Sequence, residues 1–519
     1  MSDSLEKEWM DIVGRDLKQV FAAFRSVVRK ARHVTASETH SGSSLESYLL
    51  PYSIARKDER KVCLDNDKRA HSKGGMLLST SIPLKSALCC LLLFATPPPK
   101  FSLDALTLSG PSKSSSLTLT HRFGACSQIS GGKASTPTLT EIFSRDRSRV
   151  KSIRSRLNFN STKSNFQTLL ATLPAIYGGS LGIGDYVVSV GLGTPKNDLS
   201  LIFDTGSTLS WTQCQPCVTS CYQQQDPIFD PSMSSTYSNI TCASAECSHL
   251  ITATGVRPGC SGSTCVYGIQ YGDQSSSVGF FAQETLTITS TDVFSRFHVR
   301  GKFGRTDGLL GLGRDQLSFV SQTAQKYGQY FSYCLPARSS SMGTLTFGNS
   351  GAPSNLKFIP MLNTGTTFYF LDLTAIYLGG RELPISPATF LTAGTIIDSG
   401  TVVSWLPPAA YGALQMGFRQ QMRMYPPAPS NSLLDTCYDL SAYTTVTVPT
   451  ISFLFGGNVT VGIDPSGILY PVSSSQFCLA FTANSAASDV GIFGNFQQKT
   501  LEVVYDVAGG KLGFGPGGC

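Results

Sequence analysis

The sequence predicts an all-β protein built from two like halves, and two observations carry that prediction. Segments with helical periodicity are scarce after residue 180, where short alternating runs are separated by turns rich in glycine, serine and threonine. The nonamer FDTGSTLSW at residues 203–211 returns as IDSGTVVSW at residues 397–405. Because 519 residues exceed what one hydrophobic core normally supports, at least two domains are expected.

Each nonamer places one aspartate on a tight turn that follows an apolar strand. Asp204 and Asp398 lie 194 positions apart, and the two copies share Asp, Gly, Ser and Trp at the same offsets. Two carboxylates brought to about 3 Å cannot both ionise, so they share one proton. The charged member can take a proton from water while the protonated member hydrogen-bonds a substrate carbonyl. Such a pair hydrolyses acyl bonds without a metal or a covalent intermediate.

The residues beside each aspartate suggest supporting roles. Gly206 and Gly400 are expected to let the backbone turn sharply. Ser207 and Thr401 are expected to donate hydrogen bonds that hold the carboxylates in place. The alternative is that the two motifs are unrelated Asx turns in a β-protein.

The charge of the chain is unevenly distributed. Residues 1–170 hold 26 lysines and arginines against 14 aspartates and glutamates, whereas residues 171–519 hold 15 against 20. A basic N-terminal part followed by an acidic remainder is typical of a solvated extension and a pro-segment, with an anion- or nucleic-acid-binding arm as the alternative. Residues 171–519 alone, being acidic, are a poor match for nucleic-acid phosphates.

Fifteen cysteines are too many for a reduced cytosolic enzyme without a metal, and seven of them fall between Cys214 and Cys265. The motif Cys214-x-x-Cys217 could bind zinc, but no second such motif follows at the spacing of a zinc finger. We therefore expect disulfides in an oxidising compartment, and neither a metal nor a cofactor. Three N-glycosylation sequons agree with secretion: Asn160, Asn239 and Asn458.

The first 172 residues divide into three segments. Residues 1–75 are predicted to be an extension, disordered apart from a basic amphipathic helix. Residues 76–99 carry an apolar core of about ten residues, too short to span a bilayer and typical of a signal peptide, with a plastid transit segment as the alternative. Residues 100–172 are predicted to be a pro-segment. We expect its cationic helix to cover the carboxylates near neutral pH and to leave in acid.

Residues 184–519 resemble the pepsin-like aspartic proteases. Besides the nonamers, the resemblance rests on YGIQYGD at 267–273, GLLGLG at 308–313 and GIFGN at 491–495. The cysteine-rich insert is similar to the plant nepenthesin-like branch, and FSYCL at 331–335 resembles members described as chloroplast-nucleoid DNA-binding-like. The implied architecture is a pepsin-like acid protease fold with two β-rich lobes, 184–350 and 351–519, and a cleft between them.

The resemblance also implies roles for single residues. Asp204 and Asp398 match the catalytic pair, and the glycines that follow them belong to the substrate-binding site. Tyr271 matches the flap tyrosine, on a hairpin that closes over the substrate. Trp211 matches the partner of that tyrosine, and a core aromatic is the compatible alternative. The two glycine-rich apolar motifs match strands that thread beside each catalytic turn.

The disulfides implied by the resemblance leave one cysteine over. The implied pairs are Cys214–Cys217, Cys242–Cys265, Cys247–Cys260, Cys334–Cys519 and Cys437–Cys478. Cys221 then has no partner, because the Phe-Gly-Cys-Gly strand of that branch is missing from residues 295–304. We therefore expect a free thiol and an exposed sheet edge in the half that carries Asp204.

The expected function is an aspartic endopeptidase that cleaves extended peptides at acid pH. The expected protein is a monomer without a stable membrane span, in the apoplast or vacuole, with the plastid as the alternative. Two other functions stay open: a catalytically impaired binding or inhibitor protein on the same fold, and a DNA-binding nucleoid protein. No Gly-x-Ser-x-Gly elbow stands in a strand–helix context, and no phosphate loop or HExxH motif occurs.

Overall fold

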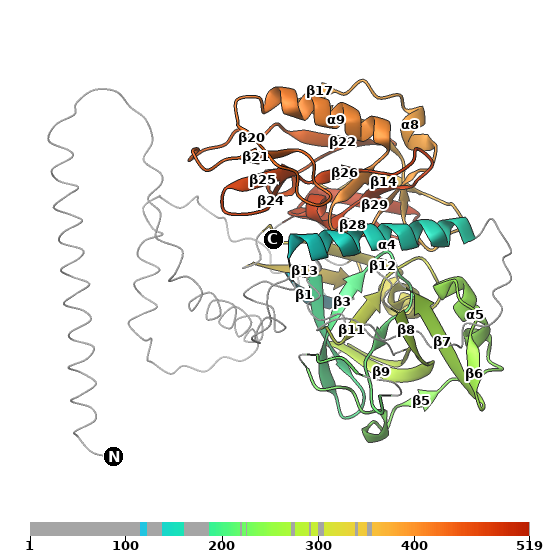
Figure 1. The fold of residues 1–519 in the computed structure, drawn as a ribbon. Coiled ribbons are helices and arrows are strands. Elements are labelled where there is room, and N and C mark those ends of the chain that lie inside the picture. The colour runs from blue at the N-terminus through green and yellow to red at the C-terminus, as the bar shows by residue number, and fades with distance from the viewer. Residues whose placement is uncertain are drawn as a thin grey trace, which may run out of the picture. The chain divides into compact units, whose positions relative to one another are not determined.

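The structure is a computed structural model that describes residues 115–121, 138–159, 186–217, 221–224, 226–270, 276–289, 292–298, 306–337, 341–349, 355–517 and 519. The predictions for residues 1–75 and 76–99, for Tyr271 and for Asn160 lie outside the described residues. Within this part the predicted mainly-β fold of two lobes is confirmed (Figure 1).

The N-terminal lobe is mainly strand. Its strands are β2 (Tyr186–Leu192), β3 (Asn197–Asp204), β4 (Trp211–Thr212), β5 (Ser238–Asn239), β6 (Gly259–Ser261), β7 (Thr264–Gln270), β8 (Ser276–Phe280), β9 (Ala282–Thr289), β10 (Asp292–His298), β11 (Gly308–Gly311), β12 (Tyr330–Cys334) and β13 (Met342–Phe347). Its short helices are η2 (Pro231–Met233), α5 (Ala245–Thr254), α6 (Phe319–Gln322) and α7 (Ala324–Tyr327).

The C-terminal lobe repeats this character. Its strands are β14 (Lys357–Leu362), β15 (Phe370–Leu371), β16 (Leu373–Leu378), β17 (Arg381–Glu382), β18 (Thr395–Ile397), β19 (Ser404–Leu406), β20 (Pro427–Ala428), β21 (Cys437–Asp439), β22 (Ile451–Phe455), β23 (Val459–Gly462), β24 (Leu469–Pro471), β25 (Gln476–Leu479), β26 (Phe481–Ala483), β27 (Gly491–Phe493), β28 (Leu501–Asp506) and β29 (Lys511–Pro516). Its helices are α8 (Ala388–Leu391), α9 (Pro408–Gln421), η3 (Pro465–Gly467) and η4 (Asn495–Gln498).

The strands that carry the two aspartates have the same surroundings in both lobes. In the N-terminal lobe, β11 lies parallel to β3, with Gly311 opposite Asp204, and antiparallel to β4. In the C-terminal lobe, β27 lies parallel to β18 and antiparallel to β19. The last six residues of β3 are all buried, as expected of a strand covered on both faces. The duplication read from the nonamers therefore extends to the strands that support them.

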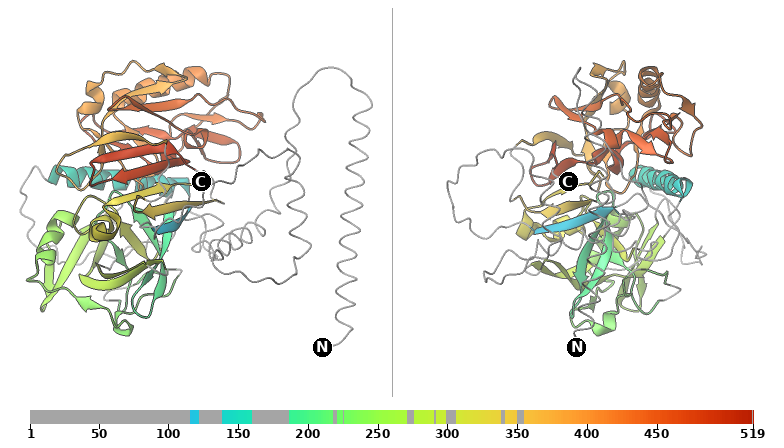
Figure 2. Two further views of the ribbon diagram at one scale, coloured as in Figure 1. Left: turned by 180° about the vertical axis from the view of Figure 1, so that it is seen from behind. Right: turned by 90° about the vertical axis from the view of Figure 1, so that its left-hand side faces the viewer.

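Two elements from the segment before residue 184 join this body. Strand β1 (Ser115–His121) pairs with β13 and β2, and Leu119 is fully buried in the core. Helix α4 (Leu139–Phe159) lies between the elements of the N-terminal and C-terminal lobes in Figure 1, and Figure 2 shows it from two further sides. The segment thus contributes a strand to the sheet as well as a helix, and the strand was not expected from the sequence.

Local sequence explains why α4 starts where it does. Thr138 and Glu141 form a capping box, because each side chain accepts a hydrogen bond from the backbone amide of the other. Ile142, Phe143 and Ile153 are buried in a cluster with side chains of the C-terminal lobe. The apolar face of α4 therefore packs against that lobe, and the basic residues lie on the other sides of the helix.

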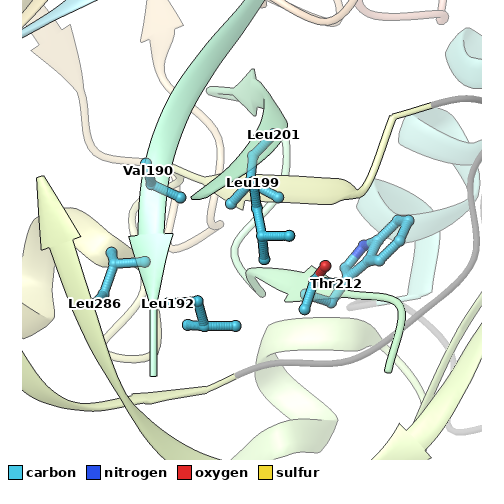
Figure 3. Close-up of a pocket in the computed structure, with 7 residues that line it drawn as sticks. Val190, Leu192, Leu199, Leu201, Thr212 and Leu286 are labelled. Carbon is cyan, nitrogen blue, oxygen red and sulfur yellow. The ribbon is translucent and has the colours of Figure 1, made fainter. Parts of the chain in front are cut away.

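A small apolar cavity lies inside the N-terminal lobe, beside the strand that carries Asp204. Figure 3 shows the side chains that surround it, which come from β2, β3, β4 and β9: Val190, Leu192, Leu199, Leu201, Trp211, Thr212 and Leu286. Nearly all of these groups are apolar, so the cavity is core space and offers little to a peptide substrate.

The disulfide pairing agrees with the expectation in part. Cys334 pairs with Cys519 and Cys437 with Cys478, as the resemblance implied. In the cysteine-rich insert the expected pairs are wrong, since the bonds are Cys217–Cys221, Cys242–Cys260 and Cys247–Cys265.

Burial explains the corrected pairs. Cys247 and Cys265 are both buried, while Cys242 and Cys260 both lie near the surface, so each cysteine bonds to a partner at its own depth. Cys214 is buried in the main core, whereas Cys217 is exposed. The expected free thiol at Cys221 is therefore wrong. Residues 295–298, where we expected a strand to be missing, extend β10, which pairs with β9.

Candidate active site

The structure brings the two predicted catalytic aspartates together at the junction of the lobes. Asp204 and Asp398 are both fully buried. A single nitrogen, Nη2 of Arg149 on α4, lies 2.5 Å from Asp204 Oδ1 and 2.8 Å from Asp398 Oδ1. The two carboxylate oxygens therefore both lie within hydrogen-bonding distance of one atom, which is the arrangement that one bridging water requires.

Asp398 receives the support that the sequence predicted. Thr401 Oγ1 donates to its Oδ2 at 2.5 Å, and the amide of Gly400 donates to its Oδ1 at 3.1 Å. Asp204 is held differently: the amide of Gly206 donates to its Oδ1 at 2.9 Å.

The predicted hydrogen bond from Ser207 to Asp204 is not formed. Ser207 Oγ is buried and has no hydrogen-bond partner in the described part of the chain. Arg149 instead donates to both oxygens of Asp204, through Nη1 at 3.1 Å and Nη2 at 2.5 Å. The guanidinium therefore supplies the side-chain hydrogen bonds that the serine hydroxyl was expected to give.

Gly206 and Gly400 are needed for space rather than for an unusual turn. Neither has the left-handed φ that favours glycine. A Cβ on Gly206 would lie 2.5 Å from Asp398 Oδ1, and a Cβ on Gly400 would lie 2.8 Å from Asp204 Oδ1. Each glycine makes room for the carboxylate of the opposite lobe, which corrects the reason that the sequence suggested.

A reciprocal pair of hydrogen bonds joins the two turns, and sequence reasoning missed it. The amide of Thr205 donates to Ser399 Oγ at 3.0 Å, and the amide of Ser399 donates to Thr205 Oγ1 at 2.9 Å. The pattern that could have revealed it is the hydroxyl residue directly after each aspartate. Because each lobe supplies one half, this contact fixes the separation of the two carboxylates.

The two tryptophans of the nonamers have different surroundings. Trp211 is buried in a cluster with Leu209 and the cysteine-rich insert, which agrees with a core role. Its proposed partner Tyr271 lies outside the described residues, so the flap prediction stays a prediction. Trp405 faces α4 instead, and its indole Nε1 donates to Asp146 Oδ2 at 3.2 Å.

Arg149 dominates the electrostatics of the two carboxylates. Burial alone would raise the pKa of Asp398, but the charge and hydrogen bonds of Arg149, with those of Thr401 and Gly400, hold it below its usual value. The pKa of Arg149 is raised well above its usual value, because the two carboxylates outweigh its burial. In this state the pair is neutralised by a cation and is not available to activate water.

Asp146 fixes α4 to the C-terminal turn. Its carboxylate accepts hydrogen bonds from the amide of Val402 at 2.6 Å and from the amide of Val403 at 3.4 Å, in addition to the indole of Trp405. Burial raises the pKa of Asp146 to about 7, and the hydrogen bonds and the charge of Arg149 only partly oppose that shift. Nothing in the sequence marks Asp146 as a contact residue, since an aspartate in a basic helix resembles a solvated charge.

Two further arginines of α4 lie along the same junction. Arg154 forms an ion pair with Asp489 at 2.9 Å. Arg156 donates to the carbonyl of Gly206 at 2.9 Å and stacks over the ring of Phe368 at 4.7 Å. The helix therefore covers both catalytic turns and the surface on either side of them.

The described residues contain neither a candidate metal cluster nor a candidate membrane-spanning helix. No group of three or more His, Cys, Asp and Glu side chains in that part of the chain could hold a metal ion. Cys217, one half of the candidate zinc motif, forms a disulfide. None of the described helices combines the length and the hydrophobicity that a membrane span requires.

Two β-rich lobes that each lend one aspartate to a common centre define the class of bilobal acid proteases. Family models described as the N-terminal and C-terminal parts of xylanase inhibitors match residues 186–349 and 368–516. An aspartyl protease family protein of Arabidopsis thaliana is 52% identical over 414 residues, which cover 78% of this chain and 87% of that protein. The chain belongs to the pepsin-like aspartic protease family, in its plant branch related to xylanase inhibitors.

A more distant relative agrees with this assignment, and a solved structure shares the fold. Aspartic proteinase nepenthesin-2 of Nepenthes gracilis is 38% identical over 357 residues, covering 65% of this chain and 78% of that protein. The crystal structure of conglutin gamma, a basic 7S globulin from lupine seeds, matches with a TM-score of 0.52 and 20% identity over 64% of this chain and 91% of that one. At that identity the likeness shows the fold alone.

Proposed function

We propose that the mature protein is an aspartic endopeptidase and that the chain described here is its inhibited precursor. The observation that carries the proposal is the pair of buried carboxylates, Asp204 and Asp398, that meet at one nitrogen of Arg149. With the arginine withdrawn, two acids at this separation share one proton. The relatives named as aspartic proteases support the same function.

The chemistry follows from the position of that proton. A water molecule takes the place of the guanidinium between the carboxylates, and the ionised member removes a proton from it as it attacks the scissile carbonyl. The protonated member donates a hydrogen bond to the carbonyl oxygen and stabilises the tetrahedral intermediate. The pair titrates as a unit, so the proton belongs to both aspartates. The reciprocal hydrogen bonds of Thr205 and Ser399 keep the geometry constant through the cycle.

Residues 100–172 act as the pro-segment in this proposal. Helix α4 lies where an extended peptide would bind between the lobes, and Arg149 neutralises both aspartates. Acid weakens this hold through Asp398, because protonating that carboxylate removes one partner of the arginine. The tyrosine flap at Tyr271 and the lobe boundaries near 184–350 and 351–519 complete the proposed enzyme.

A non-catalytic binding or inhibitor protein is the second candidate. The descriptions of the matching family models, which refer to xylanase inhibitors, favour it. Against it, both aspartates, both glycines and the hydroxyl contact between the turns are present and assembled. DNA binding has less support, since residues 171–519 carry fewer basic than acidic residues.

The disulfides support a proposal for the compartment. The five described disulfides and the plant relatives are consistent with a secreted or vacuolar protein. The sequons at Asn239 and Asn458 lie on exposed residues, as glycosylation requires. We propose the apoplast or the vacuole, with the plastid as the alternative.

The test is an acid activation assay on the full chain. The purified protein is acidified, its new N-terminus is determined, and cleavage of a peptide mixture is measured with and without pepstatin beside the Asp204→Asn variant. We expect pepstatin-sensitive cleavage that the variant lacks, and a new N-terminus after Phe159. Absence of cleavage by the acid-treated wild type would favour the binding protein, and a salt-dependent shift of DNA would favour the nucleoid function.

A further inference from the structure

Helix α4 lies across the catalytic centre, and its side chains bind to groups on both sides of that centre. The groups that surround each α4 side chain indicate which substrate side chains can bind at the same position. Arg149 marks the position of the scissile bond through its contacts with both aspartates. Arg154 is five residues further along, about 7.5 Å along the helix axis at about 1.5 Å per residue. An extended peptide advances about 3.3 Å per residue, so the site of Arg154 lies about two residues from the scissile bond.

The surroundings of Arg154 form a built site for a cation. Its Nη1 lies 2.9 Å from Asp489 Oδ2, and its Nη2 donates to Asn484 Oδ1 at 2.8 Å. Its guanidinium carbon lies 5.7 Å from the centre of the Trp405 ring, within the range of a cation–π contact. A carboxylate, an amide oxygen and an indole face thus converge on one position.

The acceptor groups are held in place by the C-terminal lobe itself. Asn484 is 4% exposed, and its Nδ2 donates to the carbonyls of Asp489 and Val490 at 2.8 and 3.0 Å, which turns its Oδ1 toward Arg154. Asp489 Oδ2 also accepts from the amide of Ala486 at 2.9 Å. These bonds involve no residue of α4, so we expect the site to keep its form when the helix leaves.

We propose that Trp405, Asn484 and Asp489 form a substrate subsite that selects a lysine or arginine side chain about two residues from the scissile bond. The inference rests on the proposed function, because it requires a peptide to replace α4 in the cleft. Removal of Arg154 would otherwise leave a carboxylate and a buried amide oxygen without their cation, and a basic substrate side chain restores both contacts.

The test compares peptides that differ at one position. Internally quenched peptides carry Lys, Arg, Gln or Glu at each of the three positions on either side of the scissile bond, and kcat/KM is measured with acid-activated wild type. At one position we expect Lys or Arg to exceed Gln by about tenfold, as one charge-assisted hydrogen bond would give. Glu should be cleaved more slowly than Gln there.

Two variants decide whether Asp489 causes the preference. Asp489→Asn keeps the shape and an oxygen for the amide of Ala486, so the ratio of kcat/KM for the Lys or Arg peptide to that for the Gln peptide should fall to about twofold or less. Asp439→Asn is the matched control, because this exposed carboxylate of the same lobe bonds the amide of Ser441. It should leave the preference unchanged.

The outcomes separate the subsite from the enzyme. Cleavage without a basic preference, or a basic preference that survives Asp489→Asn, overturns the subsite and leaves the endopeptidase in place; Arg154 would then only anchor the pro-segment. If acid-activated wild type cleaves none of the peptides, the proposed function fails and the subsite fails with it.

Discussion

The two catalytic turns have the same backbone surroundings but are held in different ways. In the C-terminal turn, Asp398 is fixed by the hydroxyl of Thr401 and the amide of Gly400. In the N-terminal turn, Asp204 has the amide of Gly206, while the hydroxyl of Ser207 is buried without a partner in the described part of the chain. Arg149 donates twice to each carboxylate, so among the described residues it is the only side chain that donates to Asp204, whereas Asp398 also has Thr401. The N-terminal turn is therefore the one that depends on the pro-segment.

The contacts of α4 with the two lobes also differ. On the C-terminal side, the helix buries an apolar face and seats Asp146 on the amides that follow Thr401. On the N-terminal side, the described hydrogen bonds come from two arginines, Arg149 and Arg156. Helix α4 is therefore anchored to the C-terminal lobe and contacts the N-terminal lobe through charged side chains. Loss of charge pairing should free the N-terminal turn first.

The largest expected effect comes from removing either carboxylate. Asp204→Asn and Asp398→Asn should each lower kcat of the acid-activated enzyme by about 10²–10⁴-fold, because general acid–base catalysis needs both members of the pair. The measurement is steady-state cleavage of one quenched peptide, with Asp439→Asn as the control that retains activity. If one of the two variants kept wild-type activity, the two turns would not be equivalent in chemistry.

The second effect should come from Arg149. Arg149→Ala leaves two buried carboxylates without their cation, and truncating one partner of such a pair costs about 2–5 kcal/mol. We expect α4 to release readily, so the full-length variant should cleave peptide at a pH where the full-length wild type is silent. Arg147→Ala is the matched control, because Arg147 is an exposed arginine on the same helix. Equal activity of the two variants would show that Arg149 does not restrain the enzyme.

The different contacts of the two catalytic turns explain what the sequence could and could not predict. The nonamers predicted two turns, two aspartates and the threading strands, because a duplicated backbone motif carries these directly. Thr401 as a support for Asp398 followed from the same pattern. The pattern failed at Ser207, and the side-chain donor to Asp204 is instead Arg149, which lies 55 positions earlier in another segment.

Other features were not predicted because they too depend on burial or on partners in other segments. Pairing within the cysteine-rich insert depends on which cysteines are buried, and spacing alone does not contain that depth. Strand β1 has the alternating pattern of a half-buried strand, but its partner β13 lies more than 200 residues away. Asp146 was missed because its burial is created by the C-terminal lobe and not by its own helix.

A third, intermediate effect concerns the pH at which α4 is held. The pKa of Asp146 is raised to about 7 in the docked state, so this carboxylate binds a proton more readily when α4 is docked. Its contribution to docking is therefore full near the ordinary aspartate value of 3.8 and is lost as the pH rises through about 7. The pKa of Asp398 is lowered, so its contribution is full above the ordinary value and is lost as the pH falls through the lowered one.

These opposite slopes predict that α4 is held most firmly in mild acid, and not near neutrality as the charge pattern of the sequence suggested. Hydrogen exchange of the α4 amides, corrected for intrinsic rates, should show protection that rises at least about tenfold from pH ~8 to pH ~5 and falls again in stronger acid. The Asp146→Asn variant should flatten this rise in protection. It keeps the charged and titratable neighbours of that position, Arg149 and Tyr470. Protection that falls steadily from pH ~8 downward would contradict the role of Asp146.

The smallest effect compares the two hydroxyls directly. In the full-length chain, Thr401→Ala removes a hydrogen bond to a buried carboxylate and should lower the free energy of unfolding by about 1.5–3 kcal/mol. Ser207→Ala removes a buried hydroxyl that has no partner in the described residues, so it should change that free energy by less than about 0.5 kcal/mol or stabilise the chain slightly.

After activation the order should change, because the departure of Arg149 frees the oxygens of Asp204 for Ser207 Oγ, and Ser207→Ala should then lower kcat. Denaturant unfolding of the precursor and kinetics of the mature form measure the two halves of this prediction. A precursor destabilised equally by both substitutions would mean that the two turns are held alike, which would remove the asymmetry on which the release of the N-terminal turn depends.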